Sequence, residues 1–162
     1  MKKTCFMLWL VLGLGLWAFA AEPDFSGNWA LEHESGIFHG KAIGDKAPAA
    51  NSGILITHTG NRLVVERQCV QCSNQIEEYI IDGKGRNMPK EQNGVISYSA
   101  KWDGEVLILK KGFGGTTPFG PATTAARQVW ALSADKQILT IATSSDDFGE
   151  ELMVTQVYKR QQ

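Results

Sequence analysis

The stretch from Val95 to Lys110 reads VISYSAKWDGEVLILK, and it decides the fold class. Its first half alternates, with mostly small or polar residues separating an apolar series made of Ile96, Tyr98, Ala100 and Trp102. Asp103-Gly104 follows as a two-residue turn, because this pair tolerates the positive φ of a type I′ turn. The second half, Glu105–Lys110, is a short apolar run. The stretch therefore predicts an antiparallel β-hairpin.

The same rhythm continues in both directions from this hairpin. Short β-branched or aromatic runs end in turn residues such as Thr59-Gly60-Asn61 and Ser133–Lys136. No segment after residue 21 keeps a helical apolar period for three turns. About nine strands are predicted: Gly27–Glu34, Gly53–His58, Arg62–Gln68, Gln75–Asp82, Val95–Trp102, Glu105–Lys110, Ala125–Leu132, Gln137–Ala142 and Leu152–Lys159.

Strands joined by tight turns pair antiparallel with their neighbours in sequence. An antiparallel up-and-down β-barrel buries the apolar face of such a meander and removes exposed strand edges. A two-sheet β-sandwich is the alternative. Two glycine-containing segments, Ser35–Asn51 and Gly112–Thr124, are predicted as long loops, and Ser144–Glu150 as an acidic turn. The prediction is an all-β protein with one domain.

The first twenty residues have the pattern of a signal peptide. Lys2 and Lys3 precede an apolar run from Cys5 to Ala20, and Ala18-Phe19-Ala20 matches the small-x-small cleavage pattern. The run is short for a membrane span, which needs about 20 apolar residues. An uncleaved membrane anchor is the alternative. We expect cleavage after Ala20, a mature domain over residues 21–162 with no membrane span, and a secreted or periplasmic location.

The charge balance of the chain limits the kinds of partner that it can bind. The 162-residue chain carries 16 Lys and Arg against 17 Asp and Glu, and Lys2 and Lys3 leave with the predicted leader. The mature domain is therefore mildly acidic and lacks the basic surface that nucleic-acid binding requires. We expect no nucleic-acid partner.

Four short motifs resemble a known superfamily. They are Asp24–Leu31 (DFSGNWAL), Lys101–Ile108 (KWDGEVLI), Trp130–Asp135 (WALSAD) and Val157–Arg160 (VYKR). In this order they resemble the lipocalin and calycin superfamily, and more closely secreted bacterial lipocalin-like proteins that open with Phe-Ser-Gly-x-Trp. The resemblance implies a barrel of eight to ten strands. It does not imply an enzyme, and it leaves the ligand open.

The resemblance also implies a structural closure. Trp29, in the Gly27-Asn28-Trp29 motif, is expected to close one end of the barrel, with Arg160 across its ring and Lys159 as the substitute. A guanidinium stacked on an indole stabilises by about 0.5–2 kcal/mol. These residues are interpreted as fold closure and not as ligand contacts. The chain shows no helical pattern after its last strand, which favours a minimal barrel.

Cys69 and Cys72 are the two cysteines that remain after cleavage. In an exported protein such a pair usually oxidises, so we predict a disulfide at or beside a hairpin tip between Arg62–Gln68 and Gln75–Asp82. A bridge needs Cα atoms within about 7 Å, so the chain must turn at Val70-Gln71. A redox pair and a metal site remain open alternatives.

Other candidate chemistry is weak. His33, His39 and His58 lack the spacing of a metal site. Glu77 and Glu78 are adjacent on a predicted strand and point to opposite faces, so they cannot share a proton. Asp146-Asp147 lies in the predicted turn, and Gly112–Gly115 lacks the phosphate-loop spacing. We expect no catalytic residues, no metal and no cofactor.

The sequence favours non-catalytic binding of a small, partly apolar ligand. Candidate contacts are aromatic: Tyr98, Trp102 and Trp130 on predicted strands, and Phe113 and Phe119 in the predicted loop. The alternative is an envelope structural or interaction protein whose barrel is filled by its own side chains and takes no ligand.

Overall fold

The computed structural model describes residues 22–38, 41–46, 52–68, 75–90, 94–117, 120–147 and 150–162. These residues form β-strands, turns and extended chain, with no helix among them. The strands are β1 (Gly27–Phe38), β2 (Lys41–Lys46), β3 (Gly53–Thr59), β4 (Arg62–Gln68), β5 (Gln75–Ile80), β6 (Arg86–Lys90), β7 (Gly94–Asp103), β8 (Val106–Thr117), β9 (Gly120–Leu132), β10 (Ile138–Asp147) and β11 (Glu150–Arg160).

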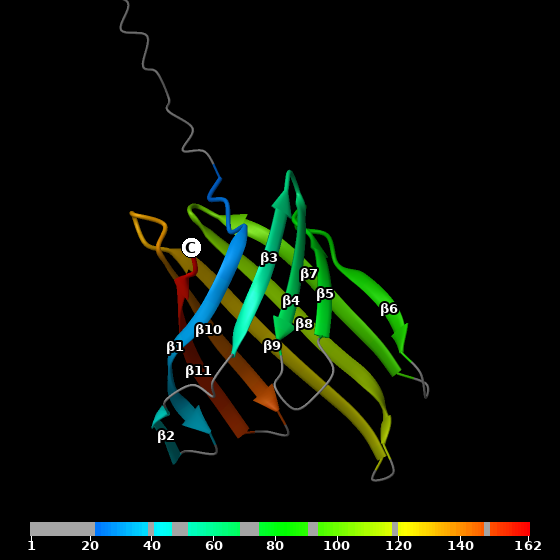
Figure 1. The fold of residues 1–162 in the computed structure, drawn as a ribbon. Helices are drawn as coiled ribbons and strands as arrows, with labels where there is room; N and C mark the ends of the chain where they lie inside the picture. Colours follow the sequence, from blue (N-terminus) through cyan, green and yellow to red (C-terminus); the bar gives the residue numbers. More distant parts are fainter. Residues whose placement is uncertain are drawn as a thin grey trace, which may run out of the picture.

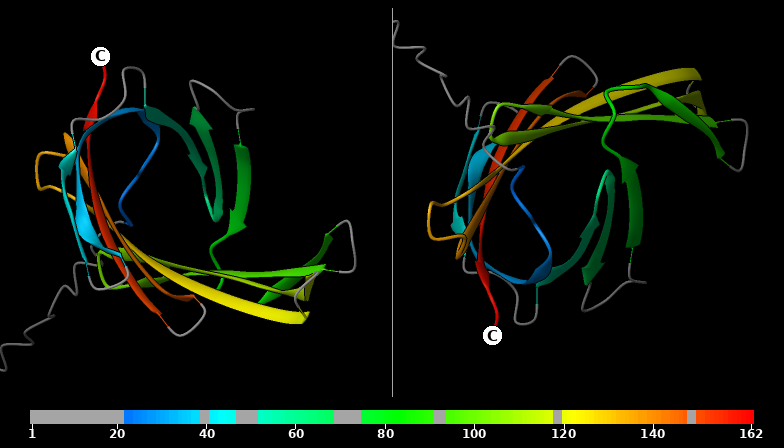
Figure 2. Two further views of the ribbon diagram at one scale, coloured as in Figure 1. Left: turned by 90° about the horizontal axis from the view of Figure 1, so that it is seen from below. Right: turned by 90° about the horizontal axis from the view of Figure 1, so that it is seen from above.

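All eleven strands belong to one antiparallel sheet. Ten of them follow the order β5-β4-β3-β1-β11-β10-β9-β8-β7-β6, and β2 pairs with β1 beside this path. The sheet curls around an interior so that β3, β4 and β5 face β7, β8 and β9 (Figures 1 and 2). The predicted all-β meander and barrel are confirmed, and the two-sheet sandwich is wrong because a single sheet supplies both walls.

The barrel wall has one seam. Within the described chain, β5 and β6 do not pair, and the isolated parallel bridge between Ile81 and Ala100 joins the end of β5 to β7. At the other side the wall is continuous, since β1 and β11 pair from Trp29↔Arg160 to Phe38↔Leu152. The first and last long strands are therefore hydrogen-bonded neighbours, as barrel closure requires.

The predicted tight turns are present. Gly60 between β3 and β4 has φ +59°, and Gly104 between β7 and β8 has φ +63°. This left-handed region favours glycine, which has no Cβ to clash. Asp135 and Lys136 turn the chain from β9 to β10, with Asp135 Oδ1 accepting from Ser133 Oγ and from the Gln137 amide.

The predicted loops are wrong in three places. β1 runs to Phe38 and β2 follows inside Ser35–Asn51. Within Gly112–Thr124, β8 runs to Thr117 and β9 begins at Gly120. β10 ends at Asp147 and β11 begins at Glu150. Glycine contributes to the first two of these loop predictions, but in this sheet it permits close approach between strands. A Cβ on Gly36 would lie 2.1 Å from the Met153 carbonyl oxygen, and one on Gly112 would lie 2.7 Å from Ser97 Oγ.

Strand β6 was not predicted, because Pro89 interrupts its pattern. It is the edge strand of the sheet and pairs only with β7, so a residue without an N–H is tolerated there. Arg86 at its start donates two hydrogen bonds to Asp82, at 2.9 and 2.7 Å.

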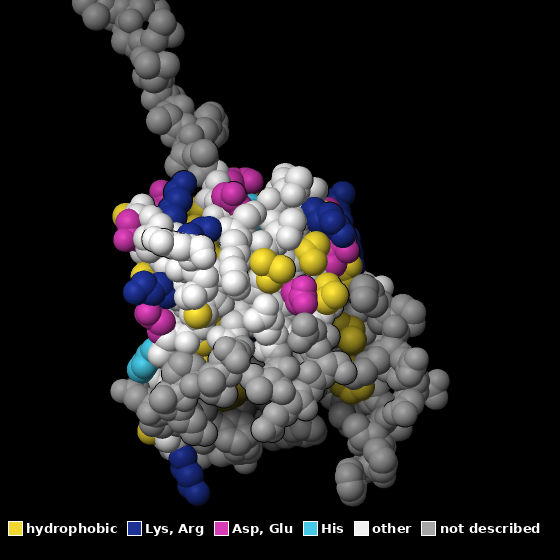
Figure 3. All heavy atoms as spheres, viewed as in Figure 1, with side chains coloured by type: hydrophobic (Ala, Val, Ile, Leu, Met, Phe, Trp, Pro, Cys, Tyr) yellow, Lys and Arg dark blue, Asp and Glu magenta, His cyan; other side chains and the backbone are white. Residues whose placement is uncertain are grey.

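The core fills the end of the barrel at the β3–β4, β7–β8 and β9–β10 turns, the upper end in Figure 1. Its largest fully buried side chains are Trp29, Trp130, Phe25, Ile54, Ile56, Leu63, Leu107, Leu109, Leu139, Ile141 and Val65. On the outside, Figure 3 shows apolar and acidic side chains mixed over β3–β5, where Leu55, Glu66 and Ile76 are cross-strand neighbours.

Candidate functional site

One end of the barrel is closed by packed aromatic rings, which we call the closed end. Phe25 lies before β1 and is fully buried between the ring of Trp102, stacked at 5.8 Å, and the edge of Trp130, at 5.9 Å between centroids. The Trp29 indole N–H donates to the Phe25 carbonyl at 3.0 Å. The rings therefore pack against one another at this end of the barrel.

Arg160 completes the closed end. Its guanidinium carbon lies 4.2 Å from the centroid of Trp29. Arg160 Nε donates to the Lys136 carbonyl at 3.0 Å and Nη1 donates to the Ser26 carbonyl. Gly27 has φ +143°, and a Cβ there would lie 2.5 Å from Arg160 Nη1. The contact that the sequence predicted between Trp29 and Arg160 is present, and Gly27 is the residue that makes room for it.

Beyond the closed end, the interior becomes polar around Glu77 of β5. One oxygen of Glu77 accepts a hydrogen bond from Lys111 Nζ, and the other accepts from Tyr79 OH at 3.1 Å. Arg67 Nε lies 3.6 Å from that second oxygen. Three strands from two opposite walls thus bring two cations and a phenol to one carboxylate. We call Arg67, Glu77, Tyr79 and Lys111 the polar cluster.

A second set of polar groups lies on the neighbouring wall. Tyr158 OH donates to Gln156 Oε1 at 3.1 Å, and Gln156 Nε2 donates to Glu34 Oε2 at 2.6 Å. Glu34 faces Gln156 because the register of β1 against β11 shifts between Leu31 and His33. Such a bulge reverses which side chains of a strand face inward.

The polar cluster shifts two pKa values. Burial by itself raises the pKa of Glu77, but the hydrogen bond and charge of Lys111, the charge of Arg67 and the hydrogen bond of Tyr79 outweigh it, so this pKa lies below its ordinary value. Burial, followed by the charge of Glu77 and the hydrogen bond to it, raises the pKa of Tyr79. Glu77 is therefore an anion and Tyr79 a neutral donor at neutral pH.

Two hollows adjoin the polar cluster. One of about 120 Å³ is lined by Arg67, Glu77, Tyr79, Leu109, Lys111, Ala126 and Gln128. The other, of about 230 Å³, is lined by Ile96, Lys111, Gly112, Phe113, Thr124, Ala126 and Ser145. Lys111 and Ala126 belong to both linings, so the hollows are neighbours. A bound group could contact the Lys111 ammonium from either hollow.

The aromatic candidates fall into separate places. Trp130 is fully buried and its indole N–H donates to Gln128 Oε1 at 3.1 Å; with Trp102 it belongs to the closed end. Tyr98 meets the edge of Tyr79 at 5.9 Å, and Phe113 lines the larger hollow. Phe119 lies outside the described residues. Tyr98 and Phe113 are thus the candidates that the fold places near the polar cluster, and ligand contact stays a prediction for all five.

Sequence reasoning missed the charged members of the cluster. The signal was available in the alternation of each strand: Lys111 is two residues from buried Leu109, and Arg67 is two residues from buried Val65. Glu77 and Glu78 do face opposite sides, as predicted, with side chains 18% and 50% exposed. Glu78 pairs with Arg62 on the outer surface at 2.8 Å.

Cys69 and Cys72 lie outside the described residues, and their disulfide stays a prediction. The strands on either side, β4 and β5, are antiparallel neighbours with Arg67 opposite Gln75, as that prediction requires. Within the described ranges, no three His, Cys, Asp or Glu side chains gather as metal ligands.

In the described chain, we find no helix with the length and hydrophobicity that a membrane crossing needs.

Similar proteins were sought by sequence and by structure. No family model and no curated protein matches the sequence. Solved structures do match. The zebrafish ileal bile acid-binding protein in complex with cholic acid superposes with a TM-score of 0.51 at 14% identity, over 85% of this chain and 98% of that one. Secretory abundant heat soluble protein 4 from Ramazzottius varieornatus gives a TM-score of 0.50 at 14% identity, over 85% and 95%. The fold is calycin-like. At this identity the likeness concerns the fold alone.

Proposed function

We propose that this protein is an exported, non-catalytic binding protein that holds a small, partly apolar molecule beside the polar cluster. The observation that carries the proposal is the set of charges on the inner wall. Arg67 and Lys111 share a single partly buried carboxylate, Glu77, next to two hollows. Charged groups inside a barrel lower its stability unless something offsets their desolvation, and a binding role supplies a reason to keep them.

The surroundings indicate the class of ligand. Ile96 and Phe113 offer apolar contact in the larger hollow, while Lys111 and Ser145 offer polar contacts. A molecule with a short apolar body and one anionic or strongly accepting oxygen group matches this lining. The bile acid-binding neighbour has the same fold and is complexed with cholic acid, an amphipathic carboxylate, which supports this class without identifying the compound.

A second candidate function is a barrel that binds no ligand and acts as an envelope structural or interaction protein. The size of the hollows favours it, since about 230 and 120 Å³ lie below the roughly 300–1,000 Å³ of typical ligand pockets. The fully packed closed end is consistent with either function.

The two functions are separated by incubating the purified mature protein with a cell lipid extract and identifying retained compounds by mass spectrometry. The binding function predicts one enriched amphipathic compound that the Lys111→Gln variant retains less. Lys101→Gln, which removes an exposed cation from the outer face of β7 away from every hollow described, is the matched control and should retain it fully. Retention of nothing, or equal retention by both variants, favours the barrel without a ligand.

Export is tested on the same preparation. Intact mass of the protein from a periplasmic fraction should correspond to a chain that begins at Ala21. A mass that retains residues 1–20 contradicts cleavage and restores the anchor alternative.

A further inference from the structure

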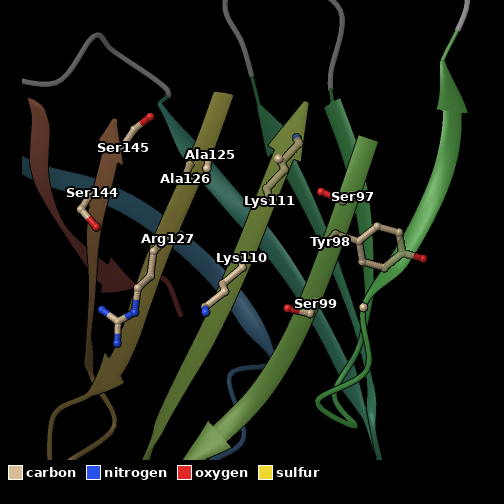
Figure 4. Close-up of a pocket in the computed structure, with 12 residues that line it drawn as sticks. Ser97, Tyr98, Ser99, Lys110, Lys111, Ala125, Ala126, Arg127, Ser144 and Ser145 are labelled. Atoms are coloured by element: carbon tan, nitrogen blue, oxygen red, sulfur yellow. The ribbon is translucent and has the colours of Figure 1, made fainter. Parts of the chain in front are cut away.

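A row of side chains crosses the outer face of the sheet opposite the polar cluster. Cross-strand pairing places Ser99 of β7 beside Lys110 of β8, Lys110 beside Arg127 of β9, and Arg127 beside Ser144 of β10. Directly paired residues of an antiparallel sheet share one face. Figure 4 shows Lys110 and Arg127 extending from neighbouring strands to the same side, while Lys111 points the other way.

Among the described residues, the two cations of this row have no acidic partner. Neither Lys110 nor Arg127 makes an ion pair within the described ranges, and no carboxylate is among the described residues that line the hollow around them. Like charges directly opposite one another on paired strands destabilise a sheet. The row therefore carries an electrostatic cost that an anion placed between the two side chains would remove.

The row borders an open hollow of about 790 Å³, larger than either interior one. Its lining includes Gly112 and Ala125, which are cross-strand partners and place only small residues beside Lys110 and Arg127 on their own strands. Tyr98 and Lys111 also line it. Ser97, Ser99 and Ser144 supply hydroxyl groups along its edges. A ligand can thus meet an ammonium, a guanidinium and several hydroxyls together.

The row continues into apolar residues. Ser144 pairs with Met153 of β11, and Met153 pairs with Ile37 of β1. Met153 is 49% exposed and Ile37 is 47% exposed. Neighbouring strands lie about 4.8 Å apart, so this exposed apolar step begins within about 10 Å of Arg127.

We propose that this outer face binds an amphiphile with a phosphate ester head, the head between Lys110 and Arg127 and the apolar part over Met153 and Ile37. A phosphate matches the donors because a guanidinium binds two of its oxygens side by side, and the ammonium and serine hydroxyls can reach the others. A carboxylate offers two oxygens and would leave donors unused. The lining of this hollow shares Lys111, Gly112, Ala126 and Ser145 with the larger interior hollow, so the two sites adjoin. The outer site rests on Lys110 and Arg127 and does not depend on the function proposed for the interior.

The test uses titration of the mature full-length protein with dodecyl phosphate, dodecanoate and dodecyl maltoside, each below its micelle concentration. Dodecyl phosphate should bind most tightly. Replacing both cations, as Lys110→Gln with Arg127→Gln, should weaken it at least about tenfold, because hydrogen bonds to charged groups are lost. Lys101→Gln, which removes an exposed cation from the same outer face of β7 but outside the lining of this hollow, should leave this affinity unchanged. Amide NMR shifts should map to Ser99, Ser144 and Met153.

A second arm identifies the source of the phosphate. The protein is sedimented with vesicles that contain phosphatidylglycerol and, for comparison, with pure phosphatidylcholine vesicles. This tests whether the outer face binds a phosphate head group within a bilayer. If the wild-type protein pellets with the phosphatidylglycerol vesicles but not with the phosphatidylcholine vesicles, and the double variant pellets with neither, the phosphate group belongs to a membrane surface. Binding of dodecyl phosphate without pelleting assigns a free monomer.

Three results would overturn the proposal. They are an unchanged dodecyl phosphate affinity in the double variant, equal affinity for dodecyl maltoside, and equal affinity for dodecanoate. Circular dichroism of the double variant checks that it is folded. The interior site is checked separately, by the effect of Lys111→Gln on the retention of compounds from the lipid extract. Failure of the outer site and failure of the interior site are therefore distinguishable.

Discussion

The two halves of the barrel interior differ in what they bury: one holds packed aromatic rings and the other holds charged side chains. At the closed end, Phe25, Trp29 and Trp130 are fully buried and their polar atoms are matched within the protein. In the other half, Glu77 and Lys111 place charges on the inner wall beside hollows. The first half gains stability from packed rings, from hydrogen bonds and from the contact of Arg160 with Trp29. The second retains charges that folding does not require, which is why we assign the binding function to it.

The largest expected effect is at the closed end. Trp130→Ala should lower the free energy of unfolding by about 3–5 kcal/mol, since it removes a fully buried indole and leaves a cavity. Urea denaturation followed by circular dichroism measures the loss. Trp102→Ala, at the partly exposed edge of the same ring cluster, should cost clearly less. Equal losses would show that the closed end is not the better packed region.

Breaking the polar cluster should have a smaller effect. Glu77→Gln leaves Arg67 and Lys111 without their carboxylate, and we expect a loss of about 1–3 kcal/mol because charge-assisted hydrogen bonds disappear. Glu78→Gln is the matched control on the outer face, where its exposed pair with Arg62 contributes little. A loss for Glu78→Gln as large as that for Glu77→Gln would contradict the inner and outer assignment.

The same carboxylate predicts a pH dependence. The pKa of Glu77 is lower in the folded protein than its ordinary value of 4.5, so its contribution to stability is present above pH 4.5 and is lost as pH falls through the folded pKa. Denaturation midpoints measured from pH 6 to pH 3 should therefore fall less steeply in Glu77→Gln than in the wild type. If the denaturation midpoints of the two proteins fall in parallel with pH, Glu77 does not contribute to the loss of stability in acid.

The Tyr79 phenol predicts a loss of stability at alkaline pH. The pKa of Tyr79 is raised in the folded protein, so its contribution is complete below its ordinary value of 10.0 and is lost as pH rises from there through the folded pKa. Between pH 9 and pH 11, the Tyr79→Phe variant should lose less stability than the wild type. Tyr98→Phe, on the facing wall, serves as the control. A Tyr79→Phe variant as alkali-sensitive as the wild type would contradict the shift.

The smallest effect compares two adjacent lysines of β8. Lys110→Gln should raise the free energy of unfolding slightly, by up to about 0.5 kcal/mol, because it removes a positive charge that lies opposite Arg127. Lys111→Gln should lower it, because Glu77 loses a partner. Thermal denaturation of both variants at low salt resolves the two signs. Changes of the same sign would mean that the two faces of β8 do not differ in charge balance.

Much of the wall of this barrel could be predicted from sequence. Alternation and turn residues are local properties, so the hairpins at Gly60 and Gly104 and the cores of nine strands followed from them. The closure between Trp29 and Arg160 followed from a motif. The extensions of β1 and β8 did not, because the reason for Gly36 and Gly112 is the backbone or side chain that approaches each of them from another strand.

The candidate site was set by tertiary structure. The sequence by itself determined that Lys110 and Lys111 point to opposite faces, because successive side chains of a strand alternate. It did not determine which of them faces Glu77 and which lies beside Arg127. That choice depends on how the sheet curls, on the bulge in β1, and on strand pairs as distant in sequence as Glu34 and Gln156. Alternation is local, whereas the partner that gives a charge its role comes from another part of the chain.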